Sequence, residues 1–310
     1  MEYREIGKTG MKVSNISFGA SSLGGVFHSL KEDDGTAAVH AAVDNGINFI
    51  DVSPYYGHLK AEIVLGKALK NIDRSKYYLS TKVGRYGKDG VNTWDYSARR
   101  VTESVYESME RLNVDYIDLI NVHDIEFADL EQVCKETLPA LVELRTKGIV
   151  KHIGITNLTL RHFKYVIDHV PTGTVESILS FCHYCLNDDA LVDYLNYFEQ
   201  QGIGVINASP FSMGLLTERG APAWHPAPVP LQNLCRKAAE YCQSKGKSIE
   251  QLAIKYSVSN PRIASTLFST TRSEAVLKNI RWADEALDED LLREVKAILE
   301  PRFRDTWLNS

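Results

Sequence analysis

The stretch Phe49-Ile50-Asp51-Val52-Ser53-Pro54-Tyr55-Tyr56-Gly57 joins a short apolar run to an acidic residue, a proline and two tyrosines. Residues 48–52 have the apolar composition of a buried strand, and Pro54 ends it because proline lacks the N–H that a central strand needs. Asp51 is therefore expected at the C-terminal end of a strand. Because a buried carboxylate needs a partner, Asp51 either takes part in the protein's chemistry, paired with a cation elsewhere in the chain, or caps a helix.

Outward from this segment, short apolar runs alternate with amphipathic stretches along the whole chain, which is the pattern of β/α units. Eight such units favour a closed (β/α)8 barrel, or TIM barrel, over an open sheet. The strands are predicted at 15–18, 48–52, 78–82, 117–122, 152–155, 175–181, 204–207 and 263–267. The helices are predicted from Asp33 or Asp34 to 45 and at 61–70, 98–112, 130–147, 160–169, 189–201, 250–259 and 273–283.

Three further segments complete the predicted architecture. Residues 3–13 predict a β-hairpin before the first repeat, and residues 288–299 an added C-terminal helix. The connection 209–231 contains five prolines and is predicted to be a long functional loop. Because no linker interrupts the pattern, we expect residues 1–310 to form a single barrel domain.

Composition narrows the classes of function. The 310 residues are 44% hydrophobic and 24% charged, with a net charge of −5 and no basic cluster, which excludes a typical nucleic-acid-binding protein. No run approaches the roughly 20 apolar residues of a membrane span, and residues 1–5 do not resemble a signal peptide. We therefore expect a cytoplasmic protein without membrane partners, present as a monomer or homodimer.

The five cysteines are expected to be reduced thiols, as is usual for a long cytoplasmic chain. Cys182 and Cys185 have the spacing of a redox motif. We interpret the segment as a strand instead, in which residues three apart point to opposite faces. No metal site is predicted.

Polar residues end several of the predicted strands, which in a barrel would meet at one mouth. These residues are Asp51, Lys82, His123 and the pair Thr156-Asn157. A buried Lys82 paired with Asp51 is predicted to lower the pKa of Tyr56, so that Tyr56 takes a hydroxyl proton near neutral pH. His123 would then hold the reacting oxygen through a hydrogen bond.

At these residues the chain resembles the aldo-keto reductase family. The resemblance rests on Asp51 to Gly57 with Glu62 and Gly66, on Ser80-Thr81-Lys82, on residues 104–118 and on Gly154-Ile155-Thr156-Asn157. It implies a nicotinamide-linked oxidoreductase with Asp51, Tyr56, Lys82 and His123 as its catalytic tetrad. The pairing His123-Asp124 resembles the family's plant sugar dehydrogenases, which implies oxidation of a sugar such as L-galactose at C1 to a lactone.

The same resemblance implies the cofactor-binding residues Thr156, Asn157, Ser180, Ser209, Ser212, Gly214, Ser269, Thr270, Arg272 and Asn279. Relatives that use NADP commonly carry cations where this chain has Ser269 and Ala275. Their absence favours NAD, because a 2′-phosphate would lose charge-assisted hydrogen bonds. Arg272 either reaches such a phosphate or faces solvent, and the Pro-rich loop 212–231 is expected to close over the dinucleotide.

Several positions depart from the usual family pattern. Ser180 and Ala208 replace a glutamine and an aromatic ring beside the nicotinamide, and Asp124 replaces a tryptophan. Asp124 would suit sugar hydroxyls, with Trp94 as an aromatic platform, or would simply form a salt bridge. We thus predict NAD-dependent oxidation of a small-molecule aldose. The alternatives are an NADPH-dependent aldehyde reductase and a non-catalytic binding barrel.

Overall fold

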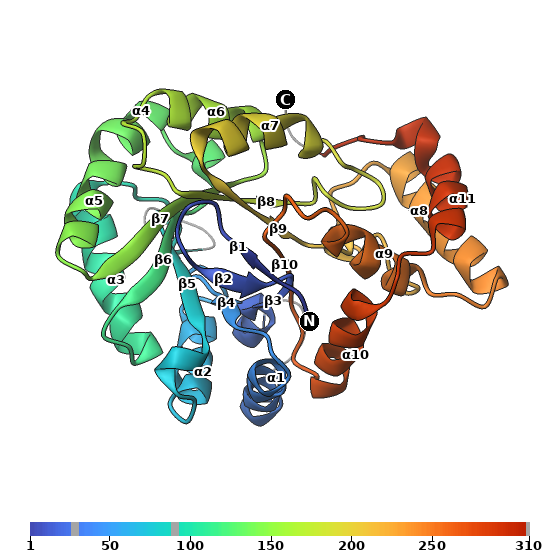
Figure 1. The fold of residues 1–310 in the computed structure, drawn as a ribbon, viewed down its shortest axis with the longest axis horizontal. Coiled ribbons are helices and arrows are strands. Elements are labelled where there is room, and N and C mark those ends of the chain that lie inside the picture. Colours follow the sequence, from blue (N-terminus) through green and yellow to red (C-terminus); the bar gives the residue numbers. More distant parts are fainter. Residues whose placement is uncertain (26–30, 88–92, 308–310) are drawn as a thin grey trace.

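Eight parallel strands form a closed barrel in the order β10-β3-β4-β5-β6-β7-β8-β9 (Figure 1). The computed structural model describes residues 1–25, 31–87 and 93–307. The strands are β3 (Ile16–Gly19), β4 (Phe49–Asp51), β5 (Tyr78–Val83), β6 (Ile117–Val122), β7 (Val150–Asn157), β8 (Ser177–Phe181), β9 (Gly204–Ala208) and β10 (Ser265–Phe268). The predicted (β/α)8 barrel is confirmed, and the C-terminal strand ends share one mouth.

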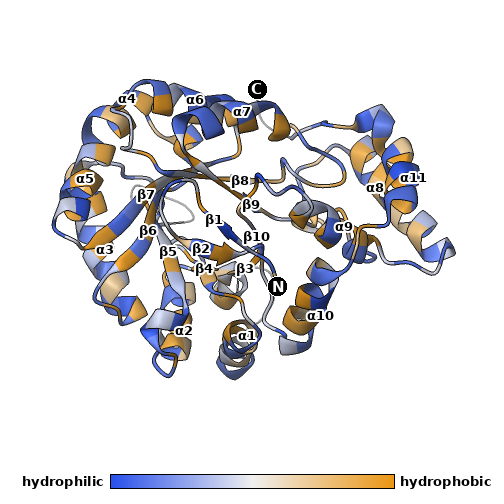
Figure 2. Cartoon of the chain, viewed as in Figure 1, coloured by the Kyte–Doolittle hydropathy of each residue, from blue (hydrophilic) through white to orange (hydrophobic). Residues whose placement is uncertain are grey.

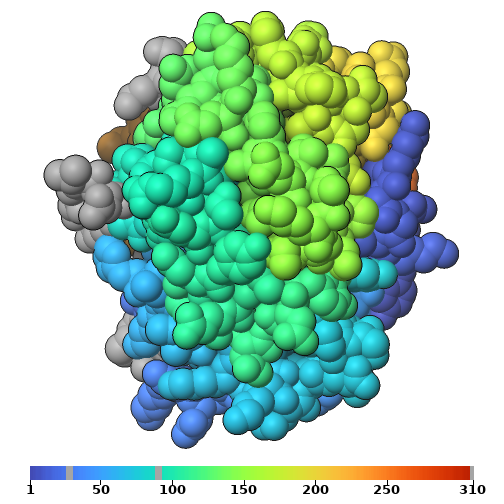
Figure 3. Space-filling view, turned by 90° about the vertical axis from the view of Figure 1, so that its left-hand side faces the viewer, coloured from blue at the N-terminus to red at the C-terminus, as the bar shows by residue number. Residues whose placement is uncertain are grey.

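Helices surround the barrel, with both hydrophobic and hydrophilic residues along them (Figure 2). They are α1 (Glu32–Asp44), α2 (Lys60–Leu69), α3 (Ala98–Leu112), α4 (Leu130–Gln132), α5 (Leu138–Thr146), α6 (Leu160–Asp168), α7 (Val192–Gln201), α8 (Val229–Ser244), α9 (Ile249–Val258), α10 (Ser273–Asp284) and the predicted additional α11 (Glu289–Leu299). Seen from the side of α3 and α5, the middle of the chain covers the centre of the surface, and N-terminal segments lie at its lower and right-hand edges (Figure 3). None of the helices among the described residues has the length and apolar composition to span a bilayer.

The predicted N-terminal hairpin closes the other end of the barrel. Its strands β1 (Tyr3–Glu5) and β2 (Lys12–Ser14) pair antiparallel. The hairpin's buried side chains Ile6, Met11 and Val13 belong to one apolar cluster with residues from the barrel strands, which are Phe49, Leu119, Leu179, Ile206 and Leu267. The barrel is therefore a packed core with a floor, and the predicted catalytic residues lie at the opposite end.

Besides α7, which begins at Val192 rather than at the predicted residue 189, the helices differ from the sequence prediction in three places. α1 begins at Glu32 after Lys31, so Asp33 and Asp34 lie in its first turn rather than capping it. Residues 130–147 are helical, but Val133–Thr137 forms a π-helical turn just before Pro139 of α5, where proline provides no backbone donor.

The third difference is α8, which the sequence analysis missed. It begins at Val229, so the prediction of an irregular loop through residue 231 is wrong at its C-terminal end. Pro228 and Pro230 do not break this helix, because proline is tolerated in the first helical turn, where the backbone N–H has no partner. The described part of the connection from 209 to 228 contains only the short 3-10 turn η5 (Ser212–Gly214).

Candidate active site

Lys82 and Asp51 form an ion pair at the barrel mouth, on the neighbouring strands β5 and β4. Both are buried, with exposed fractions of 1% and 3%. Lys82 Nζ also donates to the carbonyl oxygen of Val52 at 2.8 Å, and Ser80 Oγ donates to Asp51 Oδ1 at 2.8 Å. Asn121 Nδ2 donates to Ser80 Oγ at 3.0 Å, which extends the network to β6. The two charges are thus fixed by hydrogen bonds as well as by attraction.

Tyr56 lies beside this pair, with Lys82 Nζ 5.0 Å from the centroid of its ring. The following residue, Gly57, has φ of 63° and packs against the backbone of Gly24. A Cβ on Gly57 would overlap the carbonyl oxygen of Gly24. Glycine is therefore required for both the left-handed backbone and the close approach that place Tyr56 at the mouth.

Two other residues of the quoted motif support the site from behind. Glu62 on α2 is fully buried, and it accepts hydrogen bonds from Thr81 Oγ1 at 2.6 Å and from Arg111 Nε at 2.7 Å. Gly66 allows α2 to approach α3, because a Cβ there would overlap the carbonyl oxygen of Arg111. These residues tie α2 and α3 to β5 next to Lys82, so their role here is structural.

His123 follows β6 and completes the predicted group of four. Its exposed fraction is 3%, and its Nδ1 lies 3.1 Å from Ser53 Oγ. The His123 ring meets Tyr56 edge to face at a centroid distance of 5.8 Å and Tyr55 at 6.1 Å. The structure thus brings Asp51, Tyr56, Lys82 and His123 together at one mouth, as the strand ends predict.

Burial shifts the pKa values of these groups in different directions. Burial alone would lower the pKa of Lys82, but the Asp51 carboxylate and the Tyr56 hydroxyl together outweigh it, and the pKa is raised. Burial, followed by the charges of Lys82 and Arg85, holds the pKa of His123 well below its usual value, so this imidazole is neutral. The predicted lowering of the Tyr56 pKa is wrong in direction: Lys82 opposes the rise, but burial prevails.

Asp124 is buried and forms an ion pair with Arg85, a residue that the sequence analysis did not single out. The Arg85 guanidinium lies between aromatic rings, 3.6 Å from the centroid of Tyr55 and 4.4 Å from that of Trp94. Trp94 in turn stacks on Phe127 at 4.2 Å. The two residues predicted to contact substrate therefore lie together, but each also holds Arg85.

The backbone around Asp124 is unusual. Asp124 has φ of 47°, a left-handed conformation that Asp tolerates better than most residues. Its N–H donates to Thr156 Oγ1 at 3.0 Å, and burial raises the pKa of its carboxyl although Arg85 opposes the shift. Of the two interpretations offered by the sequence, the ligand-free geometry favours the salt-bridging aspartate.

The segment after β9, predicted to contact the cofactor, contains four residues with a left-handed backbone. Ser209, Ser212, Met213 and Gly214 have φ values of 61°, 48°, 55° and 109°. Such a cluster of strained non-glycine residues is typical of functional segments. Ser212 is fully buried, and its hydroxyl has no partner within the described part of the chain.

The strand ends of β7 and β8 carry three other predicted cofactor residues. Thr156 bonds to Asp124, as described above. Asn157 is engaged within the protein, since its Oδ1 accepts from Glu126 N at 2.8 Å and its Nδ2 donates to Thr159 O at 2.9 Å. Ser180 is fully buried, and its hydroxyl finds no partner among the described residues. The unpaired hydroxyls of Ser180 and Ser212 fit a polar ligand such as a nicotinamide dinucleotide.

The segment after β10 holds the remaining predicted cofactor residues. Ser269 Oγ donates to Ser22 Oγ at 2.8 Å and accepts from Ser22 N at 2.9 Å, which links β10 to the segment after β3. The Arg272 side chain is 67% exposed, and its Nε lies 3.9 Å from Glu274. The other two predicted residues are Thr270, which is partly exposed and precedes α10, and Asn279, which is buried on α10.

Sequence comparison identifies the family to which this barrel belongs. Residues 15–300 match the Aldo/keto reductase family. The chain belongs to the aldo/keto reductase family. L-galactose dehydrogenase of Arabidopsis thaliana is 49% identical over 99% of this chain and 97% of its own length. The predicted resemblance to the plant sugar dehydrogenases of the family is therefore confirmed.

More distant relatives agree with this assignment. D-arabinose 1-dehydrogenase of Saccharomyces cerevisiae is 34% identical over 70% of this chain and 67% of its own length. An aldo-keto reductase of Bacillus halodurans superposes with a TM-score of 0.80 at 24% identity, covering 96% of each chain. The solved structure supports the fold alone. The sequence relatives identify this aldo/keto reductase as an enzyme of the oxidoreductase class. Membership of the family implies a nicotinamide cofactor and a small-molecule substrate.

The cysteine pair of this aldo/keto reductase does not form the predicted strand. β8 ends at Phe181, and Cys182 has a left-handed backbone with φ of 64°. Cys185 pairs with Asp188 through the backbone in an isolated antiparallel β-bridge. Both thiols are buried and unbonded to each other, and burial raises the pKa of Cys182 to about 12. Such protonated thiols are poor nucleophiles.

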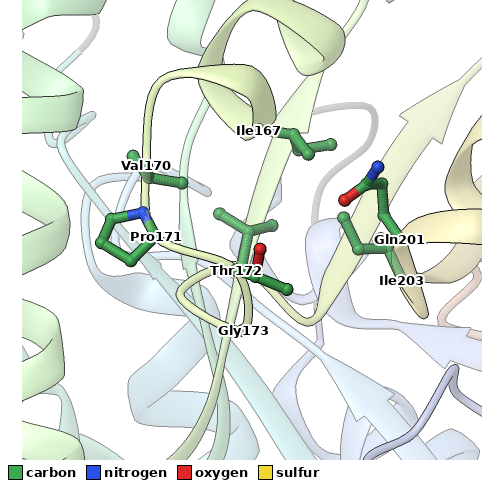
Figure 4. A pocket seen from close by; sticks show the side chains of 8 residues that line it. Ile167, Val170, Pro171, Thr172, Gly173, Gln201 and Ile203 are labelled. Carbon is green, nitrogen blue, oxygen red and sulfur yellow. The ribbon is translucent and has the colours of Figure 1, made fainter.

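A small hollow lies at the far end of the barrel (Figure 4). It is lined by residues of the α6–β8 and α7–β9 connections, among them Ile167, Val170, Pro171, Gln201 and Ile203. These connections precede their strands, whereas the predicted catalytic groups follow theirs. Because none of its lining residues is ionisable, this hollow has no apparent share in the family's chemistry.

Proposed function

We propose that this aldo/keto reductase oxidises an aldose at C1 to the corresponding lactone, with NAD⁺ as hydride acceptor and an L-galactose-like sugar as substrate. The observation that carries the proposal is the 49% identity, over nearly the full chain, to L-galactose dehydrogenase of Arabidopsis thaliana. The four polar groups at the mouth support it with a suitable chemistry. Their arrangement combines a proton acceptor, a fixed cation and a neutral imidazole.

In this proposal Tyr56 accepts the proton of the C1 hydroxyl. Lys82, held by Asp51, stabilises the phenolate that results, because a positive charge beside a phenol favours its ionised form. His123 donates a hydrogen bond to the same substrate oxygen and orients it. A nicotinamide held at the mouth would supply the hydride acceptor, so that transfer of the C1 hydride to it and of the hydroxyl proton to Tyr56 would leave a carbonyl at C1.

The cofactor would be held by the segments after β9 and β10, and we propose NAD rather than NADP. Ser212 offers an unpaired hydroxyl, and Ser269 lacks the cation that a 2′-phosphate needs. The sequence left open whether Arg272 reaches a 2′-phosphate or faces solvent. Its side chain is largely exposed and lies near Glu274, which supports the second alternative. The substrate would lie against Trp94 and the Arg85–Asp124 pair, whose polar edges suit sugar hydroxyls.

The runner-up is an NADPH-dependent aldehyde reductase of the same family. The observation that favours it is the raised pKa of Tyr56, because a protonated phenol is a general acid for reduction. The non-catalytic binding barrel is the weaker alternative, since all four predicted catalytic residues are present.

A panel of aldoses assayed with NAD⁺ and NADP⁺, alongside apolar aldehydes assayed with NADH and NADPH, separates these functions. We expect aldose oxidation with NAD⁺, at a kcat/KM at least about tenfold above that with NADP⁺. Faster reduction of apolar aldehydes than oxidation of any aldose would return the assignment to a general reductase. Equal efficiency with NAD⁺ and NADP⁺ would contradict the cofactor proposal and implicate Arg272 in phosphate binding.

A further inference from the structure

Ser53 lies between β4 and His123 and is fully buried. Its Oγ is 3.1 Å from His123 Nδ1, and the backbone N–H of Tyr55 donates to the same Oγ at 3.1 Å. Neither the sequence motifs nor the proposed mechanism assigns a task to this hydroxyl. Its two contacts decide where its single proton goes.

A serine hydroxyl has one proton to donate and two lone pairs that accept. If His123 Nδ1 carried a proton and donated to Ser53, Oγ would accept twice, and its own proton would have no acceptor among the described residues. If Ser53 donates to an unprotonated Nδ1, both Ser53 Oγ and His123 Nδ1 are satisfied. Leaving a buried hydroxyl proton unpaired costs free energy, so the second arrangement is favoured.

We infer that Ser53 is a positioning residue that holds His123 in the tautomer protonated at Nε2. A neutral imidazole carries one proton, and the partner of one ring nitrogen fixes the state of the other. The Asp124 carboxylate lies 3.6 Å from Nε2 on the opposite edge of the ring, where it also favours a proton on that nitrogen. His123 is therefore prepared to donate before any ligand arrives.

The consequence for catalysis rests on the proposed function. A substrate oxygen at C1 would meet an N–H donor rather than a lone pair, which aids both binding of the hydroxyl and stabilisation of charge on that oxygen. Ser53 itself would not touch the substrate. Its effect on the rate would pass entirely through the proton on His123.

The test is a nitrogen NMR measurement on ¹⁵N-histidine-labelled protein without cofactor or substrate, since ring nitrogens with and without a proton differ strongly in chemical shift. H123N identifies the signals of His123 by their loss. We expect a protonated Nε2 and an unprotonated Nδ1 in the unmodified protein. In S53A we expect a mixture of the two tautomers, and in S53T, which retains a hydroxyl, recovery of the original one.

Kinetics supply the second measurement. S53A is expected to lower kcat for aldose oxidation about tenfold, the equivalent of one neutral hydrogen bond, with little change in the KM for NAD⁺. S53T should recover most of the loss. The control is S257A, which deletes another buried serine hydroxyl, one bonded to the carbonyl oxygen of Ile254 on α9. It is expected to retain the parental kcat and tautomer.

A proton on Nδ1 in the unmodified protein would overturn the inference, and this result does not depend on whether any variant folds. An unchanged tautomer in S53A would overturn it too. If the tautomer responds as expected but no aldose is oxidised, the tautomer inference stands and the proposed function fails.

Discussion

At the scale of single residues, burial shifts the pKa of each ionisable group at the mouth in a direction that depends on its neighbours. Lys82 keeps its charge because Asp51 and Tyr56 together compensate for the loss of solvent, whereas burial and the nearby charges of Lys82 and Arg85 keep His123 neutral. Tyr56 lies between these two cases, since Lys82 only partly offsets its burial. Beside the Asp51 carboxylate, the predicted catalytic group therefore contains one fixed cation, one neutral hydrogen-bond donor and one phenol that exchanges its proton with difficulty.

Tyr56→Phe tests the assignment of the proton acceptor. The change removes the hydroxyl and leaves the ring, so we expect folding and NAD binding to persist while kcat falls by about 10²–10⁴-fold. Steady-state kinetics with the best aldose and a fluorescence titration with NADH measure the two properties. Retention of more than about a tenth of the turnover would move the base to His123 or Tyr55.

The pH dependence of aldose oxidation follows from the direction of these shifts. Because the pKa of Tyr56 is raised, the proton-accepting form is scarce near neutral pH and increases as the pH rises. We expect kcat/KM to rise from about pH 6 to about pH 10, with no inflection from His123 near pH 6.5, because its pKa lies well below that value. A plateau reached already at neutral pH would show that the bound cofactor reverses the effect of burial on Tyr56.

Asp124→Asn tests the ion pair beside His123. Asn retains the size and the tolerance for a left-handed backbone, but it removes the charge that holds Arg85. We expect the KM for the aldose to rise about tenfold while kcat falls much less, because Arg85 loses its fixed position. Kinetics on the best aldose measure both, and D129N, which changes an exposed aspartate that caps a helix nearby, is the matched control. Unchanged KM for the sugar would remove Asp124 and Arg85 from substrate recognition.

At the scale of elements, strand ends were predictable because an apolar run that stops at a polar residue is a local signal. The mouth positions of Asp51, Lys82 and His123 follow from that signal and from barrel topology alone. Arg85 was not predictable, because its role depends on Asp124 39 residues away and on rings from three separate segments. α8 was missed for a different reason, since prolines that begin a helix look the same in sequence as prolines that prevent one.

The 3-10 turn η3 (Ile125–Phe127), which follows Asp124, contains a testable acid. Burial and the neighbouring Asp124 raise the pKa of Glu126 to about 7. The folded protein thus binds this proton more tightly than the unfolded chain, which favours folding below about pH 4.5, and the advantage is lost as the pH rises through about 7.

Glu126→Gln should therefore stabilise the fold at about pH 8 but not at about pH 5. Gln retains an acceptor for the N–H of Leu158, so only the charge changes. We expect a gain of about 1–2 kcal/mol in the free energy of unfolding at the higher pH, reduced from the full shift because Glu126 is partly exposed. Urea unfolding at both pH values measures it. Equal effects at the two values would show that the raised pKa is not the cause.

At the scale of the whole molecule, the two ends of the barrel differ in role: the mouth carries the candidate active site, and the floor contributes to stability. The mouth gathers buried charges and strained backbone, which cost stability, while the floor packs the hairpin against inward-facing strand residues. Each strand runs from one end to the other. Burial of apolar side chains in the floor thus offsets the free-energy cost of the polar groups at the mouth, although the floor forms no part of the mouth.

This division predicts that stability and catalysis respond separately to substitution. Ile6 is fully buried in the floor cluster, so Ile6→Ala should lower the free energy of unfolding by about 2–5 kcal/mol through lost burial and a residual cavity. Because the mouth lies at the other end of a packed core, we expect kcat and KM well below the unfolding transition to stay within about twofold of the parent. Urea unfolding and steady-state kinetics on the same preparation measure both, with the exposed Tyr3→Ala in the same hairpin as control. A large loss of kcat in I6A at full folding would mean that the floor and the mouth are coupled through the strands.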